Sequence, residues 1–68
     1  NEDDYVGELT SKLCSNIEVS PRTAREIAKT ARVTVMEDAP DLSPKKKWNW
    51  TIGYVCQAVS MDVSEFQF

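Results

Sequence analysis

The feature that most constrains the fold is a Ser-Pro pair that occurs twice, at Ser20-Pro21 and at Ser43-Pro44. A serine side chain caps the first N–H groups of a helix, and proline suits the first helical position, where its missing N–H would be unpaired anyway. Each pair therefore predicts the start of a helix. Pro40 predicts the end of the helix that starts at Pro21, because the residue before a proline is pushed out of the helical region.

Apolar residues recur at helical spacing in each of the three segments that these signals define. They are Val6, Leu9, Leu13 and Ile17 in the first segment, Ala24, Ile27, Ala28, Ala31 and Val35 in the second, and Trp48, Ile52, Val55, Cys56 and Val59 in the third. We predict an all-α fold, a small three-helix bundle, with helices over about residues 4–17, 21–38 and 44–61. Residues 62–68 would be a tail or a truncated fourth element. Asp3 or Asp4 is expected to cap the first helix. The third helix, apolar on more than one side, is expected to be the central one.

The charge is spread unevenly along a chain of 68 residues, which is long enough for a single small domain. The formal net charge is −3, but residues 1–11 carry only acids, and all eight lysines and arginines lie in residues 12–47. A basic middle between acidic ends is compatible with contact to a polyanion. The whole molecule is nevertheless not a strongly basic nucleic-acid binder.

Three lysines, Lys45, Lys46 and Lys47, occupy the first turn of the third predicted helix. The helix dipole disfavours cations there, by about 0.3–1 kcal/mol each. Free backbone N–H groups, the dipole and three ammonium groups at one helix start would together form an anion site. The alternative is that Asp38 and Asp41 neutralise the lysines within the chain.

Four further cations form a row on the second predicted helix, at positions i, i+3, i+7 and i+10. They are Arg22, Arg25, Lys29 and Arg32. Arginine side chains bind phosphate oxygens in a forked geometry, so this row is a candidate for tracking a phosphate backbone. The alternative is a solvated outer face, or one paired with the acidic N-terminal segment.

A second candidate surface is apolar. Trp50, Tyr54 and Met61 fall outside the core stripe of the third helix, and the chain ends on Phe66 and Phe68. Tryptophan and tyrosine are frequent anchors of protein interfaces. These five residues are therefore predicted to dock another protein or a second copy of the chain. The alternative for Phe66 and Phe68 is that both pack back onto the helices.

Catalytic and metal-binding patterns are missing from the sequence. There is no histidine, and Cys14 and Cys56 are the two cysteines. A disulfide between them is one hypothesis; the favoured interpretation is two reduced, buried thiols. The two glycines cannot form a glycine-rich phosphate loop, and Glu37, Asp38 and Asp41 lack calcium-loop spacing. We predict no enzyme activity, no cofactor and no metal. No run approaches the roughly 20 apolar residues that span a bilayer, so no membrane partner is expected.

Several short motifs occur in a familiar order. Leu13-Cys14-Ser15-Asn16-Ile17 ends the first predicted helix, Ala31-Arg32 lies in the second, Ser43-Pro44 opens the third, and Tyr54 and Gln57 lie within it. This order resembles the start of the second cyclin-like repeat of transcription factor IIB and its archaeal relatives. In that family a Cys-Ser-Asn stretch, an Ala-Arg pair and a Gly-Arg-Ser-Pro turn take these places. Here Asp41-Leu42 replaces the Gly-Arg.

The resemblance implies a non-enzymatic helical module that contacts promoter DNA backbone and transcription proteins. The contact would lie near the Ser43-Pro44 turn, where the three lysines stand. The helices that read bases in that family follow the matched part, so base reading is not implied. The expected partners are DNA backbone or an acidic protein surface, with another protein or self-association as the alternative. The expected location is intracellular, and nuclear under the resemblance. A small secreted helical peptide with one disulfide is the other alternative.

Overall fold

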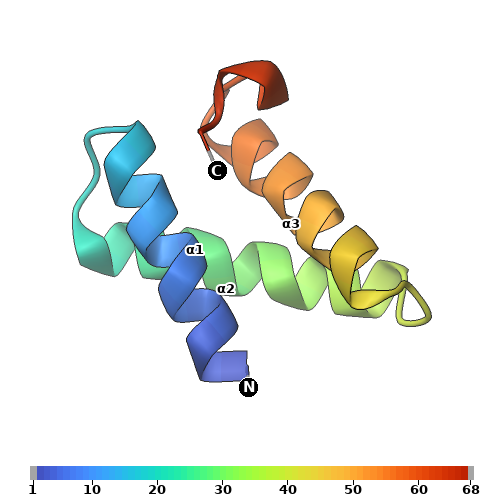
Figure 1. Cartoon of the computed structure of the whole chain (residues 1–68). Coiled ribbons are helices and arrows are strands. Elements are labelled where there is room, and N and C mark those ends of the chain that lie inside the picture. The colour runs from blue at the N-terminus through green and yellow to red at the C-terminus, as the bar shows by residue number, and fades with distance from the viewer. Residues whose placement is uncertain (1, 68) are drawn as a thin grey trace.

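The computed structural model describes residues 2–67, with side chains from Asp4 onward (Figure 1). Within this range the chain forms helices α1 (Glu2–Asn16), α2 (Pro21–Asp38) and α3 (Pro44–Ala58), followed by a short 3-10 helix, η1 (Val63–Glu65). The predicted all-α fold with three helices is confirmed.

Both serine caps are present. The Ser20 Oγ accepts a hydrogen bond from the Thr23 N–H at 3.2 Å, and the Ser43 Oγ accepts one from the Lys46 N–H at 3.4 Å. Helices α2 and α3 therefore start where the Ser-Pro pairs predicted. Helix α1 begins at Glu2, so Asp3 and Asp4 lie inside its first turn and neither is the cap that we expected.

Helix α3 ends at Ala58, three residues earlier than the sequence predicted. Ser60 adopts a left-handed conformation with φ 56°. The N–H of Ser60 donates to the Gln57 carbonyl at 3.3 Å, and the N–H of Met61 donates to the Cys56 carbonyl at 2.9 Å. This pair of bonds is the Schellman motif, which satisfies the last carbonyls of a helix. Glycine usually supplies the left-handed residue, and its absence hid this helix end in the sequence.

The central helix is α2, because α1 and α3 each pack against it (Figure 1). The expectation that α3 would be central was wrong. Ala24, Ala28 and Ala31 are buried along α2, and such small side chains let two neighbouring helices approach closely. Helices α1 and α3 are linked to each other by long side chains that reach across between them.

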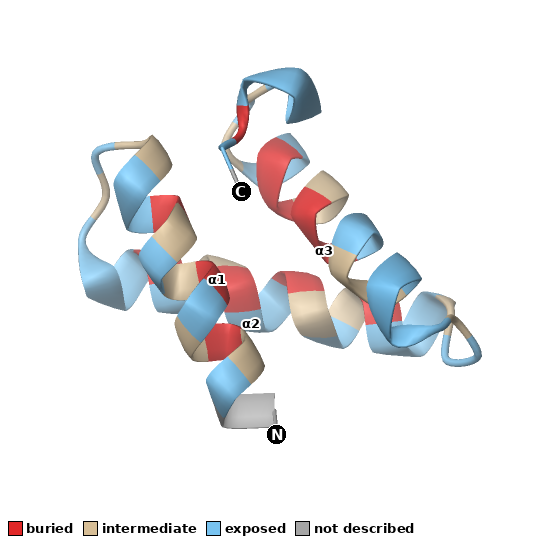
Figure 2. Cartoon of the chain, viewed as in Figure 1, coloured by how far each residue is buried: buried red, intermediate tan, exposed pale blue. Residues whose placement is uncertain are grey.

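The core lies between the three helices, as the buried positions in Figure 2 show. Its members follow the predicted stripes: Val6, Leu9 and Leu13 from α1, Ala24, Ala28, Ala31 and Val35 from α2, and Ile52, Val55 and Cys56 from α3. Trp48, Ile27, Ile17 and Val59 are half-buried at its edge. The sequence pattern missed Thr51, which is fully buried on α3.

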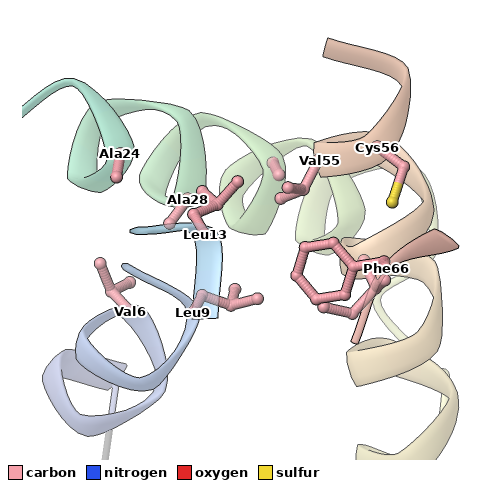
Figure 3. Packing of buried hydrophobic residues seen from close by; sticks show 10 residues of the cluster. Val6, Leu9, Leu13, Ala24, Ala28, Val55, Cys56 and Phe66 are labelled. Carbon is pink, nitrogen blue, oxygen red and sulfur yellow. The ribbon is translucent and has the colours of Figure 1, made fainter. Parts of the chain in front are cut away.

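The tail folds back onto the helices. Phe66, predicted to belong to a partner interface, is 4% exposed and inserts into the core beside Val55 and Cys56 (Figure 3). The Gln67 N–H donates to the Asn16 Oδ1 at 2.8 Å, and the Asn16 Nδ2 donates back to the Gln67 carbonyl at 3.1 Å. The interface prediction for Phe66 is therefore wrong. Its segment is too short to show a helical period, so the pattern could not reveal its burial.

Helix η1 starts with its own cap. The Asp62 carboxylate accepts hydrogen bonds from the Ser64 N–H at 2.9 Å and from the Ser64 hydroxyl at 2.8 Å. These two bonds, the backbone one first, hold the pKa of Asp62 below its usual value. The cap fixes the turn that leads from α3 into the position of Phe66.

Candidate functional site: the α2–α3 face

A groove with a volume of about 420 Å³ runs between α2 and α3. Its lining residues are Glu26, Ile27, Thr30, Ala31 and Thr34 from α2, and Tyr54, Gln57 and Ala58 from α3. Two smaller hollows share some of these residues, so the surface is continuous. One hollow adds Lys29 and Val33 on α2, and the other adds Trp50 and Gly53 on α3. We call this whole surface the α2–α3 face.

Large apolar side chains stand exposed on this face. Trp50 is 46% exposed and Val33 is 49% exposed. The Thr34 hydroxyl donates to the Thr30 carbonyl at 2.8 Å, so its polar end is already bonded within α2. The face thus offers apolar surface in a concave shape, which is how sites for apolar side chains of a partner are built.

The other predicted interface residues have different surroundings. Tyr54 lines the groove and is half-buried, and its hydroxyl donates to the Asp38 Oδ2 at 3.1 Å. This hydrogen bond, desolvation and the nearby negative charge raise the pKa of Tyr54. Met61 is half-buried and packs against the core. Phe68 lies outside the described residues. Of the predicted interface, Trp50 and Tyr54 therefore meet on one described surface.

Sequence reasoning missed most of the lining on α2. Thr30 and Thr34 were given no role because threonine is neither a typical anchor nor a charged contact, and Ile27 was assigned to the core stripe. The signal was present in Val33, an apolar residue outside the inward stripe that follows Thr30 by three residues and directly precedes Thr34. Gly53 was also overlooked, although a glycine inside a helix leaves its neighbours' surface open.

Arg32, one of the predicted phosphate contacts, has its guanidinium group packed inside the molecule. The Arg32 Cζ lies 4.2 Å from the centre of the Tyr5 ring, and its Nε and Nη1 are buried without a hydrogen-bond partner. The guanidinium therefore makes a cation–π contact inside the molecule. Placing Arg32 in an outward row was wrong. Residues spaced by three, four and three positions do not stay on one side of a helix, and the Arg32 side chain faces α1.

The remaining cations form two separate groups. Arg22, Arg25 and Lys29 are exposed along the first half of α2. The three lysines lie at the start of α3, next to the opposite end of α2 (Figure 1). Since α2 has 18 residues, its ends are about 27 Å apart. The seven predicted contacts therefore do not make one continuous basic patch.

The start of α3 offers fewer backbone donors than expected. Pro44 has no N–H, the Lys46 N–H is bonded to the Ser43 Oγ, and the Lys47 N–H donates to the Ser43 carbonyl at 2.8 Å. The Lys45 N–H is left as the donor of this turn. Any anion bound here would depend chiefly on the lysine ammonium groups.

The lysines are not neutralised by direct ion pairs in the described part of the chain. Lys45 and Lys46 are exposed and Lys47 is half-buried, and none of them pairs with Asp38 or Asp41. The Asp38 carboxylate accepts from the Tyr54 hydroxyl instead. The alternative interpretation was that Asp38 and Asp41 neutralise the lysines, and these acids form no ion pair with them.

The two cysteines are free thiols, so the disulfide hypothesis is contradicted. Cys14 is exposed on the flank of α1, with its Sγ 3.8 Å from the Val19 carbonyl oxygen, so its expected burial was also wrong. Cys56 is buried in the core. Burial raises the pKa of the Cys56 thiol, and the negative charge of Asp62 adds to this effect.

Among the described residues, no group of three histidine, cysteine or acidic side chains could hold a metal ion. None of the helices in residues 2–67 is long and apolar enough to cross a membrane. No protein-family model matches the sequence, and neither a curated protein nor a solved structure gives a significant match. The resemblance to a cyclin-like repeat therefore stays a prediction.

Proposed function

We propose that this chain is a non-enzymatic helical binding module that docks a partner protein on the α2–α3 face. The observation that carries the proposal is a groove of about 420 Å³ beside a tryptophan that is 46% exposed. Exposed apolar surface in a concave setting is typical of protein interaction sites. Grooves between two helices accept the apolar face of a further helix.

The energetics favour Trp50 as the main anchor. Covering its exposed part would remove roughly 100 Å² of mostly apolar surface from water, worth about 2.5 kcal/mol. A side chain that contributes more than about 2 kcal/mol ranks as a hot spot in an interface. Lys45 and Lys46, by contrast, are exposed, and each exposed charge pair is worth less than about 1 kcal/mol.

The proposal is tested with Nile red, a neutral apolar dye, so that the lysines do not attract the probe. We expect saturable binding to the folded protein, and Trp50→Ala should weaken it at least about fivefold, consistent with a loss of 1 kcal/mol or more. Asn49→Ala is the matched control, because Asn49 is the exposed neighbour on α3 that does not line the groove. Unchanged dye affinity in folded Trp50→Ala protein would overturn the proposal.

A second candidate function is contact with a polyanion such as the DNA backbone, through Lys45, Lys46 and Lys47. The support is their lack of ion-pair partners at one end of α3. It is also the contact that the resemblance to a transcription factor IIB repeat implies. The contact would be independent of base sequence, because phosphate contacts carry no sequence information directly.

This candidate is tested by anisotropy with labelled duplex DNA over a range of salt concentrations. Replacing the three lysines with alanine should lower the slope of log affinity against log salt by about 2.7, since each phosphate contact contributes about 0.9. The matched control replaces Arg22, Arg25 and Lys29, which removes the same charge from the other group. Binding that does not respond to salt, or none at low salt, would exclude this function.

A further inference from the structure

We propose that the occupant of the α2–α3 face is a second copy of this chain, packed antiparallel across a two-fold axis. The inference rests on the proposed use of this face for docking, and it names the partner. It is argued from the order of charges along the two helices that form the face.

Helix α2 is basic at its start and acidic at its end. Arg22, Arg25 and Lys29 lie in its first half, against Glu26 alone. Glu37 and Asp38 lie in its last turn, which contains no basic residue, and its first turn contains no acid. This order opposes the helix macrodipole, which favours acids at the start of a helix and bases at its end.

Helix α3 shares the basic start of this order, and acids follow only beyond its end. Lys45, Lys46 and Lys47 occupy its first turn, which has no acid, and its last turn has no base. Asp62 and Glu65 follow its end and are exposed. Both helices of the face therefore carry charges that are unfavourable for an isolated helix. Neither group of cations is relieved by an ion pair among the described residues.

An antiparallel second copy relieves both helices at once. In a two-fold interface each element near the axis meets its own reversed copy. The basic start of α2 then lies against the acidic end of α2 in the second copy. The lysines at the start of α3 lie toward Asp62 and Glu65, beyond the end of α3 in the second copy. A parallel arrangement would place like charges together. An unrelated partner would give no reason for two helices of one face to share the same charge order.

The apolar part of the face and its size suit this arrangement. Val33, 49% exposed, lies about 5 Å beyond the midpoint of an α2 about 27 Å long, and Trp50 stands across the groove. A specific interface buries about 800 Å² per partner. That is less than one fifth of the 4556 Å² accessible surface of the chain. Two such faces packed together would form a four-helix arrangement, with α2 and α3 from each copy and the groove residues at its centre.

The first experiment measures the molecular mass of the full chain by sedimentation equilibrium over a wide range of concentrations. We expect a reversible monomer–dimer equilibrium. Val33→Glu should raise the dimer dissociation constant at least about tenfold, because it places a charge near the axis. Val63→Glu is the matched control: Val63 is 47% exposed, but on η1 and away from the face, so its dimer should be unchanged.

The second experiment tests the antiparallel order. Arg22→Glu with Lys29→Glu makes the start of α2 net acidic, like its end. Glu37→Lys, with Asp41→Lys just beyond α2, makes the end net basic, like the start. Each double variant alone should dimerise at least about tenfold more weakly than the wild type. Mixed in equal amounts, the two should form a heterodimer, because each half of α2 then meets its opposite charge. Asp38 is left unchanged to keep its bond to Tyr54.

Three results would overturn the second-copy proposal: a monomer at every concentration, a dimer that Val33→Glu does not weaken, or mixed variants that stay monomeric. The Nile red experiment, at a protein concentration well below the dimer dissociation constant, tests the proposed function independently of dimerisation. A monomer that binds Nile red in a Trp50-dependent manner contradicts only the second copy and leaves another protein as the occupant. A monomer without such binding contradicts both.

Discussion

Two tryptophans, two residues apart on α3, lie on two sides of the molecule that differ in how far other side chains cover them. Trp48 is half-buried and packs edge-on against Tyr5, with ring centres 5.1 Å apart. Trp50 is 46% exposed on the α2–α3 face. We call the first the closed side, because side chains of all three helices meet there. We call the second side, the α2–α3 face, the open face, because the residues that the structure describes leave it accessible to solvent.

On the closed side, hydrogen bonds of buried and half-buried polar groups add to the apolar packing. The Tyr5 hydroxyl donates to the Thr51 Oγ1 at 3.0 Å, and the Thr51 hydroxyl donates to the Lys47 carbonyl at 2.6 Å. The Arg32 guanidinium lies over the Tyr5 ring. The open face has one bond between helices among its described side chains, from Tyr54 to Asp38. Helix α3 is thus apolar on two sides, and the described residues cover only one of them.

The largest expected effect concerns the tail that completes the closed side. Phe66→Ala should lower the free energy of unfolding by about 3 kcal/mol, because it deletes a nearly fully buried aromatic ring from the core. Urea unfolding followed by circular dichroism measures this. Val63→Ala, three residues earlier and exposed, should change it by less than about 0.5 kcal/mol. A loss below about 1 kcal/mol for Phe66→Ala would mean that the tail is not part of the core.

The tryptophan pair gives the next largest contrast. Trp48→Ala should cost about 2 kcal/mol of stability, roughly half the value for a fully buried aromatic. Trp50→Ala should cost less than about 0.5 kcal/mol, since its ring is largely solvated in the isolated chain. The same urea titrations at low protein concentration compare the two. Equal losses would show that Trp50 belongs to the core and would remove the basis of the open face.

The sequence predicted the local parts of this structure well. The helix starts at Pro21 and Pro44 follow from caps and prolines a few residues away, and the inward stripes follow from spacing along one helix. The misses involve residues whose surroundings come from far along the chain. Phe66 is buried by helices ten or more residues away, and Arg32 is held by Tyr5 of another helix.

The candidate site was predicted in part for the same reason. Trp50 and Tyr54 could be recognised because they fall off the core stripe of their own helix. Their partners Thr30 and Thr34 could not, because the groove exists only where α2 and α3 cross. No spacing rule within one helix states which outward residues of two helices will face a common hollow.

Smaller effects are expected at the two helical glycines. A Cβ built on Gly7 or on Gly53 would meet nothing within 4 Å. Changing either to alanine should therefore stabilise the monomer by about 0.5–1 kcal/mol, by restricting the unfolded chain and favouring the helix. Gly53→Ala should also weaken the dimer, because Gly53 lines the open face, whereas Gly7→Ala should not. If both leave the dimer unchanged, Gly53 lies outside the contact.

The smallest effect is a pH dependence at the bond across the open face. The pKa of Tyr54 is raised because its neutral hydroxyl donates to the Asp38 carboxylate. The folded pKa exceeds the unfolded value, so this stabilisation is complete below about pH 10 and is lost as the pH rises further. An absorbance titration of tyrosinate should show Tyr54 ionising at lower pH in Asp38→Asn. An unchanged curve would mean that the bond does not form in solution.

The pairing of Asn16 with Gln67 joins residues 51 positions apart. Closing so long a loop costs conformational entropy before any contact compensates for it. The junctions between successive helices involve only a few residues, so helix pairing faces a much smaller barrier. We therefore expect the tail to dock last during folding and to release first during unfolding. The Gln67 amide would then exchange with solvent through a local opening, while the amides of α2 exchange only when the whole chain unfolds.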